Sequence, residues 1–259
     1  MKLTVVRADP AGNITLFVRT PVDKAQYGAV GEKLLALPEL KGEQVGFLLG
    51  DGRMEMAGGE FCGNATRAFG LLTAKERGLT GKCHLTLSVS GCEKPVGADV
   101  DTDAGTARAE MPLPRFVRAE TVGGVQGTLV HLGGIAHCVV VGVAPSEAFF
   151  AEAEPMFRAL GGLEAYGVIF LDTKTGKMCP LVKVPAVNSL VWEGSCGSGS
   201  LAAAIAQSAG IRDGVFERDY VQPAGTIRVT VERRGGEVTS AYIGGRVTLD
   251  EPIEVEINL

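Results

Sequence analysis

The sequence has little of what a nucleic-acid or membrane protein needs. Its formal net charge is −5, so it has no excess of Lys and Arg with which to neutralise phosphates, and a nucleic-acid partner is excluded. No apolar run reaches the roughly 18 residues that a membrane span requires. The N-terminal segment also lacks the apolar stretch of a secretory signal. We therefore expect a cytoplasmic protein with no membrane partner.

Metal-ligand patterns are also scarce. The chain contains three His, and its six Cys are widely spaced with no CxxC pair. This spacing indicates neither a zinc site nor a disulfide framework, and cytoplasmic thiols are expected to be reduced. No Gly-rich phosphate loop of the Walker or dinucleotide type is present. We therefore predict no metal and no cofactor, and a reaction carried out by side chains alone.

Glycine is abundant, with 36 residues placed between alternating apolar runs, as is typical of turns in a strand-rich protein. The order of the predicted elements is repeated in the two halves of the chain. In each half, two hairpins precede a Cys-Gly pair that enters a helix, and an alternating strand follows. The expected hairpins cover 4–18 and 45–54, then 128–141 and 168–178. The expected helices cover 67–77 and 201–209.

This repeat predicts an α+β fold of two pseudo-symmetric domains, each a curved, mostly antiparallel sheet around a central helix. The Pro-marked stretch 111–115 is the expected boundary, which gives domains 1–115 and 116–259. A return of the final strand to the first domain is left open. Because a cleft between two such domains is a natural ligand site, we expect the active site there.

The two Cys-Gly turns carry the predicted chemistry. Cys62 and Cys196 each stand just before a helix start rich in Gly, Ser and Asn. Backbone N–H groups that lack partners, together with the positive end of the helix dipole, make such a turn an anion site. We expect this setting to lower the pKa of each thiol toward neutrality. Two thiols on opposite faces of one carbon can remove and return an α-proton, so Cys62 and Cys196 are predicted as the catalytic pair of an amino-acid racemase.

The same motifs are similar to the catalytic signatures of the diaminopimelate epimerase superfamily. The similar segments are Glu60–Ala65, Ser195–Gly199, the Asn turn Pro10–Asn13 and the Pro-Gly-Gly-like turn Gln222–Gly225. The resemblance runs from about residue 5 to residue 255 and implies a cofactor-independent mechanism with two thiols. It further implies that the substrate carboxylate and amino group are held by Asn13, Asn64 and the backbone of Gly63, Gly197 and Ser198.

Departures from the diaminopimelate epimerases indicate another substrate. Those enzymes carry, before the second Cys, an Arg that grips the far carboxylate, whereas the shortened segment Val191–Ser195 contains no Arg. A second carboxylate buried there would be unpaired, which is costly. Four segments instead resemble the histidine racemases that supply D-histidine for staphylopine-type metallophores. These segments are Glu43–Phe47, Gly59–Thr66, Val89–Cys92 and Trp192–Gly199.

The resemblance to histidine racemases implies roles for three further side chains. Glu43 is carried over as an active-site residue whose carboxylate accepts a hydrogen bond from an imidazole N–H. Glu193 is a candidate ligand of the substrate ammonium, and His137 matches a position close to the site. For each residue a structural alternative stays open. Glu43 would then be an exposed loop glutamate, Glu193 a solvated charge, and His137 a core histidine whose hydrogen bonds are satisfied.

Other functions remain open at this point. Within the same class they are a diaminopimelate epimerase or a racemase of another amino acid. From another class, a non-catalytic amino-acid-binding protein would need the helix N-termini but not a Cys at each, so the two thiols argue against it. The expected partner is a small-molecule amino acid. The oligomeric state is left open, with a homodimer as one candidate.

Overall fold

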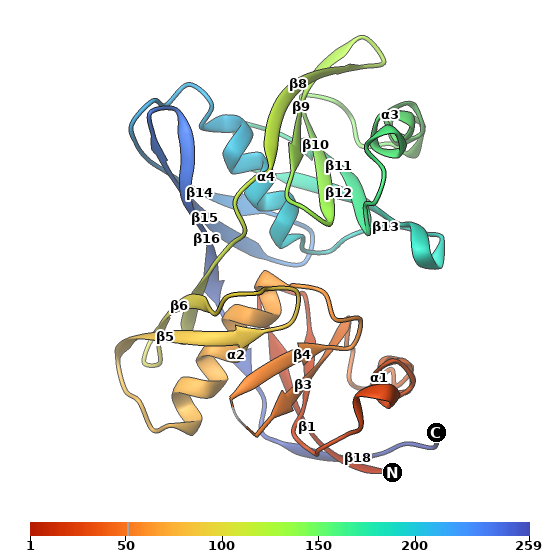
Figure 1. Ribbon diagram of the computed structural model, residues 1–259, viewed down its shortest axis with the longest axis vertical. Helices are drawn as coiled ribbons and strands as arrows, with labels where there is room; N and C mark the ends of the chain where they lie inside the picture. Colours follow the sequence, from red (N-terminus) through yellow and green to blue (C-terminus); the bar gives the residue numbers. More distant parts are fainter. Residues whose placement is uncertain (51) are drawn as a thin grey trace. The chain divides into compact units, whose positions relative to one another are not determined.

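The computed structural model describes residues 1–50 and 52–259, and the chain divides into two compact units (Figure 1). Unit 1 comprises Met1–Glu110 and Gly244–Leu259, and unit 2 comprises Met111–Ile243. The expected boundary after Arg115 lies five residues beyond the division between these units, and the Met111 backbone N–H donates to Ala241 O within unit 2. In the described part of the chain, no helix is long and apolar enough to cross a membrane.

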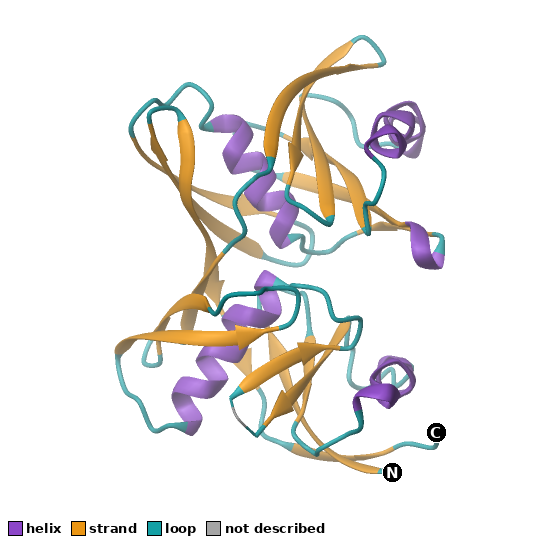
Figure 2. Cartoon of the chain, in the orientation of Figure 1, coloured by secondary structure: helices purple, strands orange, loops and turns teal. Residues whose placement is uncertain are grey.

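Unit 1 contains one sheet with a helix on each face (Figure 2). Its strands lie in the order β7-β6-β5-β4-β3-β2-β1, and β17 and β18 both pair with β1. The pairs β2–β3 and β4–β5 are parallel. The elements are β1 (Lys2–Asp9), β2 (Thr15–Val18), α1 (Tyr27–Leu35), β3 (Gln44–Leu49), β4 (Arg53–Met56), α2 (Gly63–Glu76), β5 (Lys82–Val89), β6 (Val96–Asp101), β7 (Thr106–Glu110), β17 (Thr248–Leu249) and β18 (Ile253–Glu256).

Unit 2 contains a six-stranded sheet in the order β13-β12-β11-β10-β9-β8 and the strands β14-β15-β16. Strand β16 continues into unit 1 with its last residues. The elements are β8 (Phe116–Val122), β9 (Val125–His131), β10 (Ile135–Val141), α3 (Glu147–Leu160), β11 (Ala165–Leu171), β12 (Met178–Val184), β13 (Ser189–Trp192), α4 (Gly197–Gln207), β14 (Gly214–Val221), β15 (Thr226–Arg234) and β16 (Glu237–Arg246).

The α+β class and the four predicted hairpins are confirmed. Strands β1 and β2, β3 and β4, β9 and β10, and β11 and β12 pair antiparallel. The expected turn between β3 and β4 includes Asp51, which lies outside the described residues. Two helices, α1 and α3, were not expected from the sequence. Each connects two neighbouring parallel strands, because a parallel pair needs a long crossover connection that a hairpin turn cannot provide.

The expected helical runs 67–77 and 201–209 each begin one turn too late, whereas the expectation that a helix starts just after each Cys is confirmed. Helix α2 begins at Gly63 and α4 at Gly197, immediately after the two Cys residues. The small and polar residues of each first turn are typical of loops when the sequence is considered alone. In the folded chain, the Cys side chain caps each helix and compensates for their low helix propensity.

Helix α2 is buried over most of its circumference, since every residue from Gly63 to Ala74 is buried. Successive side chains of β2 point to opposite faces of the sheet, so the strand contributes to the cores beneath both α2 and α1. Phe17 faces α2 and contacts Phe69 with ring centroids 6.3 Å apart, whereas Leu16 and Val18 belong to the core beneath α1. Helix α4 is also buried, and its own buried residues from Leu201 to Ile205 are small or aliphatic.

The packing of α2 predicts a large stability loss for Phe69→Ala. Phe69 is 4% exposed, so truncation leaves a cavity beside Phe17, and we expect unfolding free energy to fall by about 3–5 kcal/mol. Urea unfolding followed by circular dichroism measures this. Leu79→Ala, at a residue that is 37% exposed just beyond α2, is the matched control and should cost less than about 1 kcal/mol. Equal losses in both variants would contradict this account of the core.

Candidate active site

Each candidate catalytic Cys is the N-cap of a central helix. The backbone of Cys62 is extended (φ −127°, ψ 112°), and its Sγ accepts from the Ala65 N–H at 3.4 Å. Cys196 has nearly the same conformation (φ −117°, ψ 109°), and its Sγ accepts from the Gly199 N–H at 3.3 Å. Both thiols therefore lie among the unpaired N–H groups of a first helical turn, in matching geometry.

A hydroxyl group fixes the first turn of each helix. Thr66 Oγ1 donates to Cys62 O, and Ser200 Oγ donates to Cys196 O, each at 2.7 Å. Between cap and hydroxyl stand the predicted binding residues. Gly63 and Gly197 are the first helical residues, Asn64 and Ser198 the second, and N–H groups at such positions have no acceptor within the helix. An anionic group can bind there.

In unit 1, the predicted residues form a chain of hydrogen bonds. Asn64 Nδ2 donates to Asn13 Oδ1 at 3.2 Å, and Asn13 Nδ2 donates to Glu43 Oε2 at 2.8 Å. At the other end, the Nε of Arg67 donates to Asn64 Oδ1 at 3.1 Å. Because each amide both donates and accepts, the chain fixes the orientation of both Asn side chains. This chain of hydrogen bonds runs from the fully buried guanidinium of Arg67 to the exposed carboxylate of Glu43.

Gln44 belongs to this site, although the sequence analysis did not single it out. Its Nε2 donates to Asn13 Oδ1 at 2.9 Å and to Thr15 Oγ1 at 2.8 Å. Its hydrogen bond to the Cys62 thiol acts to lower the pKa of Cys62. The parallel register of β2 and β3 places Thr15 opposite Gln44 and so brings these groups together. In the sequence alone, the only indication that Gln44 belongs to the site is its position directly after Glu43.

In unit 2, His137 lies beside the second thiol cap. Its Nε2 is 2.8 Å from Ser198 Oγ, which in turn is 3.6 Å from Cys196 Sγ. Burial lowers the pKa of His137 to about 3, so the ring is neutral at physiological pH. With its proton on Nε2, His137 donates to Ser198 and leaves the hydroxyl proton for Cys196.

Gln222 is a second residue that was missed as part of the site. Its Oε1 accepts from the Cys196 backbone N–H at 2.6 Å, and its Nε2 donates to Ser200 Oγ at 3.0 Å. A buried amide therefore joins the cap residue to the first turn of α4. The sequence contains a signal for this role, because Gln222 is the first residue of the Pro- and Gly-containing turn Gln222–Gly225.

Glu193 is partly buried and hydrogen-bonds with the Cys196 thiol. Its carboxylate acts to raise the pKa of Cys196, since a second negative charge beside it is unfavourable. The structure thus places Asn13, Glu43, Gly63 and Asn64 with Cys62. It places His137, Glu193, Gly197 and Ser198 with Cys196.

The expectation that the helix N-termini lower the thiol pKa values was wrong. Burial raises the pKa of Cys62 above its ordinary value, and it raises the pKa of Cys196 well above that value. The backbone N–H groups of Ala65 and Gly199 act in the opposite direction, as expected, but desolvation is the larger effect in both cases. In the ligand-free protein the thiols are therefore mainly protonated at neutral pH.

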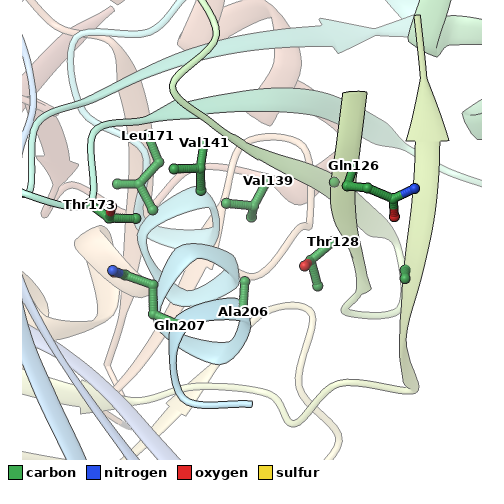
Figure 3. A pocket seen from close by; sticks show the side chains of 10 residues that line it. Gln126, Thr128, Val139, Val141, Leu171, Thr173, Ala206 and Gln207 are labelled. Atoms are coloured by element: carbon green, nitrogen blue, oxygen red, sulfur yellow. The ribbon is translucent and has the colours of Figure 1, made fainter. Parts of the chain in front are cut away.

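A cavity of about 500 Å³ lies at the opposite end of α4 (Figure 3). Its lining includes Val139, Val141 and Ala206, and none of the predicted site residues contributes to it. Counting from the two Cys residues, Ala206 corresponds to Leu72 of α2, a buried residue of the unit 1 core. The cavity is separate from the thiol turn.

The Cys196 turn predicts that Gly199→Ala is disruptive. A Cβ at Gly199 would lie 2.6 Å from Ile169 Cδ1 and 3.1 Å from Cys196 Sγ, so the thiol or the isoleucine must move. We expect a loss of about 1–3 kcal/mol in unfolding free energy and an altered alkylation rate at Cys196 but not at Cys62. Gly210→Ala, where a Cβ meets nothing within 4 Å, is the control. Unchanged stability and unchanged Cys196 reactivity would refute this packing argument.

Comparison with known proteins supports the resemblance seen in the sequence. The family model described as the histidine racemase CntK N-terminal domain matches residues 2–251. A histidine racemase from Fusobacterium nucleatum is 29% identical over 252 residues, covering 89% of this chain and 95% of the relative. A histidine racemase from Staphylococcus aureus is 27% identical over 254 residues, covering 93% and 92%.

The fold has a similar counterpart among solved structures. A predicted epimerase from Pseudomonas aeruginosa superposes with a TM-score of 0.67 at 17% identity, and the match covers 99% of this chain and 100% of the other. At that identity the likeness concerns the fold alone. The family model, which spans nearly the whole chain, shows that the chain belongs to the histidine racemase family.

Proposed function

We propose that this protein interconverts L- and D-histidine without a cofactor, with Cys62 and Cys196 acting on opposite faces of the same α-carbon. The observation that carries the proposal is the matched pair of thiol caps, one at the start of each central helix. Racemisation needs two groups that differ in protonation, and a binding protein has no use for two such thiols. The histidine racemases among its relatives support the choice of substrate.

The mechanism begins with one Cys as a thiolate and the other as a thiol. The thiolate takes the α-proton, the C–H bond breaks, and its electron pair passes into the carboxylate. The other thiol then gives its proton to the opposite face of the carbon, which inverts the configuration and leaves the two Cys with exchanged protonation states. N–H groups at Gly63, Asn64, Gly197 and Ser198 stabilise the charge that develops on the carboxylate.

Two acidic residues account for recognition of the remaining substrate groups. Glu43 is exposed and is held by Asn13, so its carboxylate is oriented before substrate arrives and accepts the imidazole N–H. Glu193, beside Cys196, binds the ammonium group. A bound ammonium would also neutralise the carboxylate that raises the pKa of Cys196, so substrate binding eases ionisation of that thiol.

Replacing either thiol should nearly abolish racemisation. With histidine in deuterated water, we expect the unaltered protein to exchange the α-proton and form D-histidine, followed by NMR and chiral chromatography. Cys62→Ser and Cys196→Ser each remove one acid/base group, and a loss of about 10²–10⁴-fold is expected. Cys179→Ser, at a partly buried Cys outside the thiol turns, should retain full activity. A rate like that of the unaltered protein in either of the first two variants would rule out the two-thiol mechanism.

Glu43→Gln tests substrate recognition separately from the chemistry. Loss of a charge-assisted hydrogen bond worth about 1.5–3 kcal/mol should lower kcat/KM for histidine by roughly 10–100-fold. Any exchange of amino acids without an imidazole should be unaffected. Glu39→Gln, at an exposed residue on the same connection, is the control. If all substrates lose activity equally, Glu43 acts by orienting Asn13, and its contact with imidazole is refuted.

A further inference from the structure

The chain of hydrogen bonds from Arg67 to Glu43 has two ends that differ in what they can do. The guanidinium of Arg67 carries only N–H groups and can only donate, whereas an ionised carboxylate such as that of Glu43 can only accept. Between them stand the amides of Asn64 and Asn13, and each amide has one C=O group that accepts and one NH2 group that donates. The direction of all the bonds is therefore decided at the ends.

The buried end fixes the first amide. Arg67 Nε donates to Asn64 Oδ1 at 3.1 Å, so the carbonyl of Asn64 faces the guanidinium and its NH2 group is directed to Asn13. A half-turn of this amide would set N–H groups against N–H groups and remove an acceptor from a buried cation, which is costly. Asn64 is only 3% exposed, so solvent does not replace the lost bond.

The second amide follows from the first. Asn13 Oδ1 accepts from Asn64 Nδ2 at 3.2 Å and from Gln44 Nε2 at 2.9 Å. This leaves the NH2 group of Asn13 to donate to Glu43 Oε2 at 2.8 Å. Within the described part of the chain, Glu43 Oε1 has no hydrogen-bond partner. One oxygen of the carboxylate is thus held, and the other is available to a ligand.

Arg67 is a rigid anchor for this chain of bonds. Its side chain is 0% exposed, and its Nη1 donates to Arg246 O at 3.2 Å. It stands three residues after Asn64 on α2, so the two side chains lie on the same face of the helix. A buried group bonded at both Nε and Nη1 sets the direction of the bonds more firmly than the exposed carboxylate at the other end.

The start of a central helix does not require this Arg. When α2 and α4 are aligned on their Cys caps, Arg67 corresponds to Leu201 and Asn64 to Ser198. Helix α4 nevertheless begins with the same extended cap and the same contact between Sγ and an N–H group, here at Cys196. Because the cap forms equally well beside Leu201, the buried cation serves the amides to which it is bonded in unit 1.

We propose that Arg67 is a positioning residue for substrate selection. Through Asn64 and Asn13 it holds Glu43 as a hydrogen-bond acceptor, so that the site favours an amino acid whose side chain offers an N–H group. This deepens the proposed function and rests on its contact between Glu43 and the imidazole. Without Arg67 both amides are free to turn, and Asn13 can direct its carbonyl toward Glu43, which repels the carboxylate.

The test is whether the effect of Arg67 on histidine racemisation passes through Glu43. Arg67→Met should lower kcat/KM for histidine by roughly tenfold, as expected for one hydrogen bond to a charged group. In a protein that already carries Glu43→Gln, the same substitution should cost less than about twofold, because both changes interrupt one chain of bonds. Arg67→Lys keeps a donor and should retain most of the activity.

A matched variant separates this effect from a general loss of structure. Arg233→Met removes another buried guanidinium, which donates to Ser208 Oγ and Ile205 O in unit 2. Any effect of Arg233→Met on kcat/KM should be the same with and without Glu43→Gln. If Arg67→Met likewise costs the same in both backgrounds, Arg67 acts on the fold and not through Glu43, and the proposal is overturned.

A second measurement needs neither racemisation nor a variant. NMR of the nitrogen-labelled, ligand-free protein gives the rate at which the side-chain NH2 protons of Asn13 exchange with water. The exposed Asn188, whose Oδ1 accepts from Lys183, is the internal reference. We expect exchange at Asn13 to be slower by about tenfold, and Arg67→Met to bring it close to that of Asn188.

These rates decide the matter even if Arg67→Met does not fold. An exchange rate at Asn13 equal to that at Asn188 in the unaltered protein overturns the proposal. Slow exchange that Arg67→Met abolishes, in a protein that does not racemise histidine, would support the anchoring by Arg67 and refute the proposed function instead. Racemisation of histidine with fast exchange at Asn13 would retain the proposed function and discard the role of Arg67.

Discussion

The structure around each site depends on one constraint, that a thiol must cap the start of a buried helix. The Cys side chain has to reach back to the N–H of the third residue after it, which requires the extended cap backbone seen at Cys62 and Cys196. Glycine directly after each cap leaves room for a ligand at the helix N-terminus. The hydroxyls of Thr66 and Ser200 then secure the cap carbonyls. The same burial that forms the site also makes its thiols harder to ionise.

The sequence predicted what local patterns control. Alternating residues and glycine turns located the hairpins, and the repeated Cys-Gly pairs located both central helices within a turn. Features that depend on long-range packing were not predictable. Asn64 meets Asn13 across 51 residues, and Gln44 joins them through strand register. Desolvation of Cys62 and Cys196 likewise depends on the whole surrounding fold, so a motif gave the wrong direction for both pKa values.

Repetition of a scaffold does not make its halves equivalent. The cap geometry is repeated closely, whereas the interior behind it differs. Phe69 and Leu72 of α2 belong to the unit 1 core, whereas Ala203 and Ala206 occupy the corresponding positions of α4, and Ala206 lines the cavity. The two helices also differ in charge, because Arg67 of α2 corresponds to the uncharged Leu201 of α4. The proposed binding of the substrate carboxylate depends on the geometry common to both thiol caps, whereas the differences lie behind the caps, along the helices.

The pairing of β17 and β18 with β1 has a consequence for biosynthesis. Domains generally fold as units while the chain emerges from the ribosome. The whole of unit 2 lies between the two segments of unit 1, so the sheet of unit 1 lacks its last two strands until nearly all of the chain has been made. Completion of the Cys62 half therefore depends on strands that are synthesised after the whole of the Cys196 half.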